Sequence, residues 1–286
     1  MMSRRKNRDR MMTWLLWGVM GSIVLLLGSI LGFLVVKGAG VLSWEFLSQP
    51  PRDSMTRGGV FTPLLGTFQL IGVSMFFSFP IGVATAVYLV EYSREGFFTR
   101  FLRLAIRSLA GVPSVVFGLF GLSFFCIFLR FGSSLLSAGL TLGCLALPVI
   151  VGASEAALQS VPPDYRHASY ALGATRWQTI YKVVLPAAFP SILTGAILSV
   201  GRVAGETAPI IFTGAAFFIP HAAKSLFSEV MALPYHILVL ATAGVNIEQT
   251  RPIQYGAALV LLILVLGITL TGIFWRARLR MGRRSS

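Results

Sequence analysis

The sequence predicts an all-α integral membrane protein with six transmembrane helices. Hydrophobic residues make up 55% of the 286 positions and charged residues only 12%, which is few for a soluble chain of this size. Apolar segments of about 20 residues, the length that crosses a bilayer, recur along the chain. The 24 Lys and Arg residues cluster beside these segments, as the positive-inside rule describes for membrane proteins with several spans.

Six apolar segments are long enough to cross the membrane. They cover residues 13–36, 65–90, 109–130, 133–153, 187–213 and 255–275. The first follows an Arg-rich start, so a cleaved signal peptide is the alternative interpretation. Its apolar run of about 24 residues, with no A-x-A cleavage site after it, favours a retained span. Six spans return the chain to the side on which it starts.

Basic residues predict which side each loop faces. Clusters of Lys and Arg fall in residues 1–12, 94–107, 166–182 and 276–284, where they number five, four, three and five. By the positive-inside rule, both termini (1–12 and 276–286) and the loops 91–108 and 154–186 are cytoplasmic. The loops 37–64 and 214–254 are then external. This distribution explains the net charge of +14 by topology, without nucleic acid as a partner.

The external loop 214–254 contains an apolar stretch, "LFSEVMALPYHILVLATAG", at residues 226–244. Glu229, Pro234 and His236 interrupt it. We therefore expect an interfacial or re-entrant segment and not a seventh span. A seventh span would also place the basic C-terminus on the wrong side of the membrane.

Residues 159–190, "QSVPPDYRHASYALGATRWQTIYKVVLPAAFP", carry the signals of two short helices. Pro162 and Pro163 suit the first turn of one helix, and Gly173 suits the position after its end. A second helix starts at Thr175 and leads into the fifth span. In both helices, apolar residues follow the i, i+3, i+4, i+7 spacing of an amphipathic helix. A DNA-binding helix-turn-helix has a similar outline, but attachment to membrane spans at both ends argues against that function.

This hairpin resembles the cytoplasmic loop of permease subunits in ATP-binding-cassette (ABC) importers. The pattern of that family is Glu-Ala-Ala, three residues, Gly, nine residues, an aliphatic residue, one residue and Leu-Pro. This sequence matches the spacing completely, with His167 and Ser169 in place of the Glu and the second Ala. A literal Glu-Ala-Ala at 155–157 lies 18 residues before Gly173 instead of six. We therefore assign that copy to the end of the fourth span.

The resemblance implies the fold of a type I ABC importer permease, with a core permease domain at 65–275. In that family the loop is a coupling-helix hairpin, which docks into a cleft of the ATPase subunit and passes its closure to the membrane helices. The positions of this chain that take the coupling role are His167, Ala168, Ser169, Gly173, Ala174, Thr175, Arg176, Leu185 and Pro186.

Longer stretches resemble the phosphate-specific branch of these importers and its A-type permease. They include "LAGVPSVVFGLFGL" and above all "GRVAGETAPIIFTGA", and they cover about residues 58–215. The resemblance implies phosphate import across the bacterial inner membrane, with a C-type second permease, two ATPase subunits and an external phosphate-binding protein as partners. It also implies that the ATPase uses ATP and Mg, while this chain has no cofactor. The residues alone leave phosphonate, sulfate or molybdate as the alternative substrate.

The stretch "GRVAGET" in the fifth predicted span carries two charges. Arg202 and Glu206 each cost roughly 2.5 to 3.5 kcal/mol in the middle of a membrane helix. Arg202 lies about 22 Å along the span, and Glu206 is expected one turn further on the same face. A guanidinium can donate two hydrogen bonds to an oxyanion. We therefore expect Arg202, Glu206 and Thr207 to line the substrate pathway, with Glu206 neutralising Arg202 when no anion is bound. A purely structural ion pair is the alternative.

The sequence lacks the residues that other classes of protein need for their function. No G-x-x-x-x-G-K-[ST] loop occurs, so ATP must bind to another subunit. An intramembrane enzyme would need a nucleophile with a base, paired carboxylates or metal ligands, and the three histidines have no such motif around them. Cys126 and Cys144 lie in apolar runs and indicate buried thiols, with neither a disulfide nor a metal site. A passive anion channel would not need the coupling loop. The sequence thus predicts a non-catalytic transport subunit.

Overall fold

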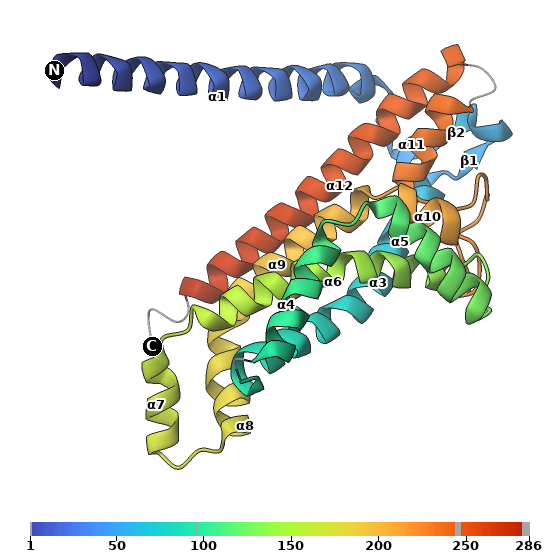
Figure 1. The fold of residues 1–286 in the computed structure, drawn as a ribbon. Coiled ribbons are helices and arrows are strands. Elements are labelled where there is room, and N and C mark those ends of the chain that lie inside the picture. The colour runs from blue at the N-terminus through green and yellow to red at the C-terminus, as the bar shows by residue number, and fades with distance from the viewer. Residues whose placement is uncertain (1, 95, 244–246, 282–286) are drawn as a thin grey trace.

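The computed structural model describes residues 2–94, 96–243 and 247–281 as a bundle of helices (Figure 1). Among these residues, five helices are long and apolar enough to cross a membrane, at 11–41, 61–92, 135–159, 176–205 and 250–278. A bent pair, 97–110 and 114–128, makes a sixth span when its two halves are counted together. The predicted all-α membrane architecture is therefore confirmed.

The N-terminal helix α1 (Met2–Gly38) leaves the rest of the bundle (Figure 1). It contacts α12 (Ile247–Met281) near its C-terminal end, where the ring centroids of Phe33 and Tyr255 are 5.6 Å apart. None of the apolar window of α1 is buried inside the bundle. A surface of this kind needs lipid or another chain to cover it.

A small structured region follows α1. It consists of α2 (Trp44–Ser48) and a two-stranded antiparallel hairpin of β1 (Pro51–Arg52) and β2 (Arg57–Gly58), with 3-10 turns at Ala39–Val41 and Asp53–Met55. The Ser43 hydroxyl accepts a hydrogen bond from the backbone N–H of Phe46 and so caps α2. This region occupies most of the predicted external loop 37–64.

Four long helices form the core of the bundle: α3 (Phe61–Val87), α6 (Leu135–Gln159), α9 (Leu185–Gly205) and α12. α3 packs along α6, α6 along α9, and α9 along α12. A Cβ atom at Gly139 of α6 would lie 2.5 Å from Cγ1 of Val73, and one at Gly82 of α3 would lie 2.6 Å from Cγ2 of Ile150. Glycine at these positions therefore permits the close approach of α3 and α6. The buried core includes Leu70, Leu142, Ala146, Ile150, Val203 and Val260.

The third predicted span, 109–130, is wrong in its geometry. The structure places α4 (Phe97–Ala110) before it, and the span itself contains α5 (Ser114–Gly121) and a π-helical segment, Leu122–Phe128. The helix axes before and after the break are bent by 103°. Pro113 accounts for the break, because proline has no N–H donor and disfavours a helical conformation at Val112 before it.

The apolar part of the loop 214–254 forms a short helix and not a seventh span, as predicted. Residues Leu233–Thr242 form α11, which packs against α12 and α3 and buries the side chain of His236. The backbone N–H of Leu233 donates to the hydroxyl of Thr67 on α3, at 2.9 Å. The segment is thus a short helix packed into the bundle. Its 10 residues are too few to cross a bilayer.

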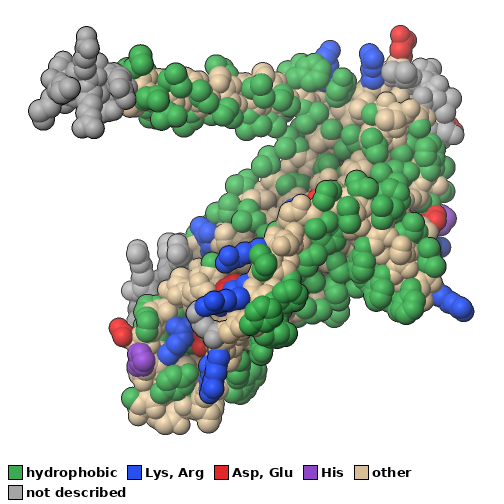
Figure 2. Space-filling model, viewed as in Figure 1, with side chains coloured by type: hydrophobic (Ala, Val, Ile, Leu, Met, Phe, Trp, Pro, Cys, Tyr) green, Lys and Arg blue, Asp and Glu red, His purple; other side chains and the backbone are tan. Residues whose placement is uncertain are grey.

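The two ends of the bundle differ in what they carry. One end, here called the hairpin end, holds α7 (Pro163–Ala171) and α8 (Arg176–Thr179) (Figure 1). The opposite end holds α2, the β-hairpin and α11. Figure 2 shows hydrophobic side chains over much of the visible sides of the helices, with several Lys and Arg side chains gathered near the hairpin end. A bundle with apolar sides is what a bilayer requires.

Candidate functional site

The coupling hairpin predicted from residues 159–190 is present in the structure. α7 ends at Ala171, and Gly173 takes a φ of +79°, in the left-handed region that favours glycine. Thr175 caps α8 through a reciprocal capping box with Gln178. The Ser169 and Thr179 hydroxyls, 2.9 Å apart, share a hydrogen bond that joins the two arms. The predicted turn at Gly173 and start at Thr175 are therefore confirmed.

The tip of the hairpin projects from the bundle. Leu172 is 89% exposed, and Trp177 on the second arm is 63% exposed. His167, Ala168, Gly173, Thr175 and Arg176 are exposed as well, while Ser169 and Ala174 are half-buried. Leu185 and Pro186 are half-buried at the start of α9. An exposed apolar tip of this kind is a surface suited to contact with another protein.

The second arm of the hairpin runs into the fifth span without a break. Residues 176–205 form one helical rod of 30 residues, about 45 Å long, that includes a π-helical segment at Ile180–Val184. The hairpin and Arg202 therefore lie near the two ends of the same rod. A displacement of the hairpin can reach the level of Arg202 along a single element.

A buried cluster fixes the hairpin to α3, and sequence reasoning missed it. Glu91 is 5% exposed and lies in the π turn Tyr88–Tyr92 at the end of α3. Arg166 of α7 donates to Oε1 of Glu91 from Nη2 at 2.7 Å and from Nε at 3.1 Å. Arg176 of α8 donates to the backbone carbonyl of Glu91, and its guanidinium lies 5.1 Å from the centre of the Tyr92 ring. An acidic residue at the edge of an apolar span was the available signal.

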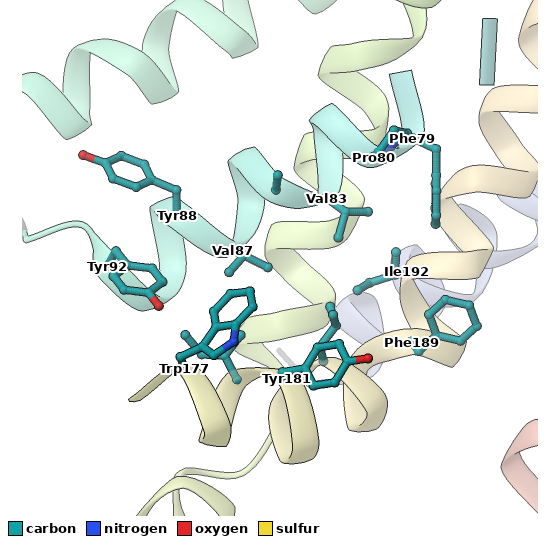
Figure 3. Close-up of a pocket in the computed structure, with 13 residues that line it drawn as sticks. Phe79, Pro80, Val83, Val87, Tyr88, Tyr92, Trp177, Tyr181, Phe189 and Ile192 are labelled. Atoms are coloured by element: carbon teal, nitrogen blue, oxygen red, sulfur yellow. The ribbon is translucent and has the colours of Figure 1, made fainter. Parts of the chain in front are cut away.

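An apolar hollow of about 540 Å³ lies beside this cluster (Figure 3). The residues that line it include Tyr88 and Tyr92 of the π turn, Trp177 and Tyr181 of the second arm, and Phe189 of α9 (Figure 3). None of the described residues that line it is charged. An oxyanion would find no cation here to balance its charge, so the hollow is not a candidate anion site.

Arg202 and Glu206 form an ion pair at the opposite end of the rod. Nε of Arg202 lies 3.5 Å from Oε1 of Glu206, and the side chains are 37% and 17% exposed. The expected position of Glu206, one helical turn further on the same face, is wrong. The helix ends at Gly205, and Glu206 has extended backbone angles, φ −75° and ψ 131°. A new short helix, α10 (Ala208–Thr213), starts after Thr207, with Pro209 in its first turn.

The break gives this pair a particular geometry. Arg202 lies in the last turn of α9, where a cation is favoured by the helix dipole. Glu206 lies between two helices, and Thr207 is half-buried beside it. The long N···O distance and the exposure of Arg202 leave hydrogen-bond donors of its guanidinium available to another acceptor. Among the described residues, no group of three or more His, Cys, Asp or Glu could hold a metal ion.

Comparison with known protein families identifies the family of this chain. Residues 78–280 match the family described as "Binding-protein-dependent transport system inner membrane component". The chain belongs to this family. Membership makes it a multi-pass membrane component of a transport system, and it confirms the prediction of a non-catalytic permease subunit.

Several bacterial proteins resemble this family member along most of their length. A probable ABC transporter permease, YqgI of Bacillus subtilis, is 33% identical over 273 residues, or 92% of each chain. The phosphate transport system permease protein PstA 1 of Mycobacterium tuberculosis is 38% identical over 262 residues, covering 91% of this chain and about 80% of that protein. PstA of Mycobacterium leprae is 40% identical over 222 residues, or 77% and 71% of the two chains.

Two solved ABC transporters share the fold. The inward-facing methionine transporter MetNI gives a TM-score of 0.60 at 22% identity, over 75% of this chain and 93% of that one. A bacterial alginate transporter in complex with its alginate-loaded periplasmic protein gives a TM-score of 0.64 at 15% identity, over 93% of both chains. The predicted type I ABC importer permease fold is thus confirmed.

Proposed function

We propose that this permease is the A-type membrane subunit of an ATP-driven importer of inorganic phosphate. The observation that carries the proposal is the 38 to 40% identity with proteins named as phosphate transport permeases. The chemistry of Arg202, which is partly exposed at a break in the fifth span, also supports the proposal. A guanidinium is always charged and can donate two parallel hydrogen bonds to a phosphate group.

The proposed transporter needs other subunits. A second, C-type permease would complete the pathway, and the apolar window of α1, none of which is buried in this chain, offers it a contact surface. Two ATPase subunits would bind ATP and Mg, and one of them would dock on the exposed tip of this hairpin. An external phosphate-binding protein would deliver the anion to the opposite end. Both termini and the hairpin are then cytoplasmic, as the basic clusters favour.

In this proposal Arg202, Glu206 and Thr207 belong to the substrate pathway. Glu206 neutralises Arg202 in the resting transporter, and the arriving anion takes its place. The hairpin residues from His167 to Arg176, with Leu185 and Pro186, form the ATPase coupling loop. His167 is exposed, so its imidazole is free to meet the ATPase where related permeases have a carboxylate.

A transport assay tests this function. The chain is expressed with a second permease, an ATPase and a phosphate-binding protein, and the assembled complex is reconstituted in vesicles. We expect uptake of radiolabelled phosphate that requires ATP and the binding protein. Competition by excess sulfate, molybdate or a phosphonate should be weak. Uptake of one of these anions in preference to phosphate would contradict the proposed substrate while leaving the transport function in place.

A further inference from the structure

One guanidinium at the hairpin end joins three helices. Besides its two hydrogen bonds to Glu91, Arg166 donates from Nη1 to the carbonyl of Val161 at 2.9 Å and from Nη2 to that of Leu158 at 3.0 Å. Leu158 lies in the last turn of α6, and Val161 follows it. Arg166 therefore ties α7 of the hairpin to both α3 and α6. The side chains of Arg166 and Glu91 are only 19% and 6% exposed.

The second arm of the hairpin reaches the same turn of α3. Arg176, the first residue of α8, contacts the Glu91 carbonyl and the Tyr92 ring. Both arms thus converge on two adjacent residues, Glu91 and Tyr92. The π turn directly follows α3, and α3 packs along α6. A shift of this turn therefore displaces the two most closely packed helices of the core.

We infer that Glu91 is a positioning residue that transmits the movement of the coupling hairpin to α3. The inference rests on the proposed function, since it assigns the path by which the ATPase acts on the membrane helices. The second arm is continuous with the rod 176–205 and moves it directly. The Glu91 contact makes α3 follow as well. A buried charge pair suits this role because separating its members leaves an uncompensated charge, so the two move as a unit.

The chain offers a matched control at the same end of the bundle. Nε of Arg103 on α4 lies 2.8 Å from Oε1 of Glu155 on α6, with side chains 25% and 17% exposed. This ion pair is of similar length, but it joins α4 to α6. Its loss would report the general cost of removing a charge pair near the hairpin.

The experiment uses the complete reconstituted transporter and measures ATP hydrolysis and anion uptake in the same vesicles. Glu91→Gln should keep hydrolysis within about twofold of the unchanged protein and lower the anions imported per ATP by roughly five- to tenfold, the range of couplings between linked sites. Glu155→Gln should leave that ratio unchanged. A proportional fall of uptake and hydrolysis in Glu91→Gln, or an equal drop in the ratio for Glu155→Gln, would overturn the inference.

A second variant covers the case in which Glu91→Gln does not assemble. Glu91→Leu with Arg166→Met replaces the pair by apolar side chains of similar size, an exchange that folded proteins often tolerate. We expect this variant to assemble and hydrolyse ATP but to import few anions per ATP. A normal ratio would show that the pair only holds the structure together. If the unchanged protein imports another oxyanion and not phosphate, the proposed substrate fails, and the same ratio measured for that anion still tests Glu91.

Discussion

The ion pairs at the two ends of the rod 176–205 are built in opposite ways. Near the hairpin, Arg166 and Glu91 are 2.7 Å apart and almost enclosed, and backbone carbonyls accept two further hydrogen bonds from Arg166. At the other end, Arg202 and Glu206 are 3.5 Å apart, and Arg202 is over a third exposed. A mostly buried pair with several hydrogen bonds holds its partners in one arrangement. A loose pair at a helix break is free to exchange one partner for a bound anion.

The largest expected difference between the two regions is the side of the membrane that each faces. Single cysteines at Asp53, Lys224 and Arg176 are introduced into a chain with Cys126 and Cys144 replaced. By the positive-inside assignment, an impermeant thiol reagent added outside intact cells should label the first two positions and leave position 176 unlabelled until the cells are opened. Labelling of position 176 in intact cells would place the hairpin outside and contradict the assignment of the two regions to opposite sides of the membrane.

The next largest effect is expected at the loose pair. Arg202→Gln should lower phosphate uptake by roughly 10- to 100-fold, because it removes charged hydrogen bonds to the anion. Arg202→Lys should rescue poorly, since an ammonium keeps the charge but lacks the planar fork. Uptake is measured against the amount of assembled complex. Arg251→Gln, which changes an exposed arginine of α12, is the control. An equal loss of uptake in Arg202→Gln and Arg251→Gln would show that Arg202 has no specific role.

A smaller effect is expected at the turn of the hairpin. Gly173 has a φ of +79°, and Gly173→Val should cost about 1 to 2 kcal/mol in this conformation. The distorted turn should weaken binding of the ATPase or uncouple hydrolysis from uptake, measured by co-purification and by the ratio of anions to ATP. Gly173→Asn should be close to normal, because asparagine tolerates left-handed angles. Equal behaviour of Val and Asn would show that the backbone conformation of the turn is unimportant.

The smallest effect is expected between the two arms. Ser169→Ala removes the hydrogen bond to the fully buried Thr179 hydroxyl and should destabilise the chain by about 1 kcal/mol. Thermal unfolding in detergent checks this, with Ser29→Ala as the control, since Ser29 bonds to a carbonyl of its own exposed helix. Uptake should change by less than about twofold, because a neutral hydrogen bond contributes little net energy. A larger loss of uptake than of stability would give Ser169 a direct part in coupling.

The features predictable from the sequence were those with local causes. Apolar length predicted four of the six spans close to their observed places, and the cap residues Gly173 and Thr175 predicted the hairpin. The breaks at Pro113 and Glu206 were not predictable, because glycine and proline are tolerated inside membrane helices when neighbours satisfy the freed backbone groups. The sequence around them therefore fits a kink and a full break equally well.

The buried cluster at Glu91 shows the other limit. Glu91 and Arg166 are 75 residues apart, and their contact depends on how α3, α6 and α7 pack. The predicted topology places both residues on one side of the membrane, but it cannot pair them. Arg202 and Glu206 were found because they are close in sequence, although the helix that was expected to join them ends at Gly205.

Phosphate uptake by the double variant Arg202→Gln with Glu206→Gln tests the central claim most directly. If Arg202 handles the anion, removing both charges restores at most the folding and assembly that Arg202→Gln loses by leaving Glu206 unpaired. The account therefore predicts normal amounts of assembled complex with uptake near background. Substantial uptake by the assembled double variant would contradict it and make the pair purely structural.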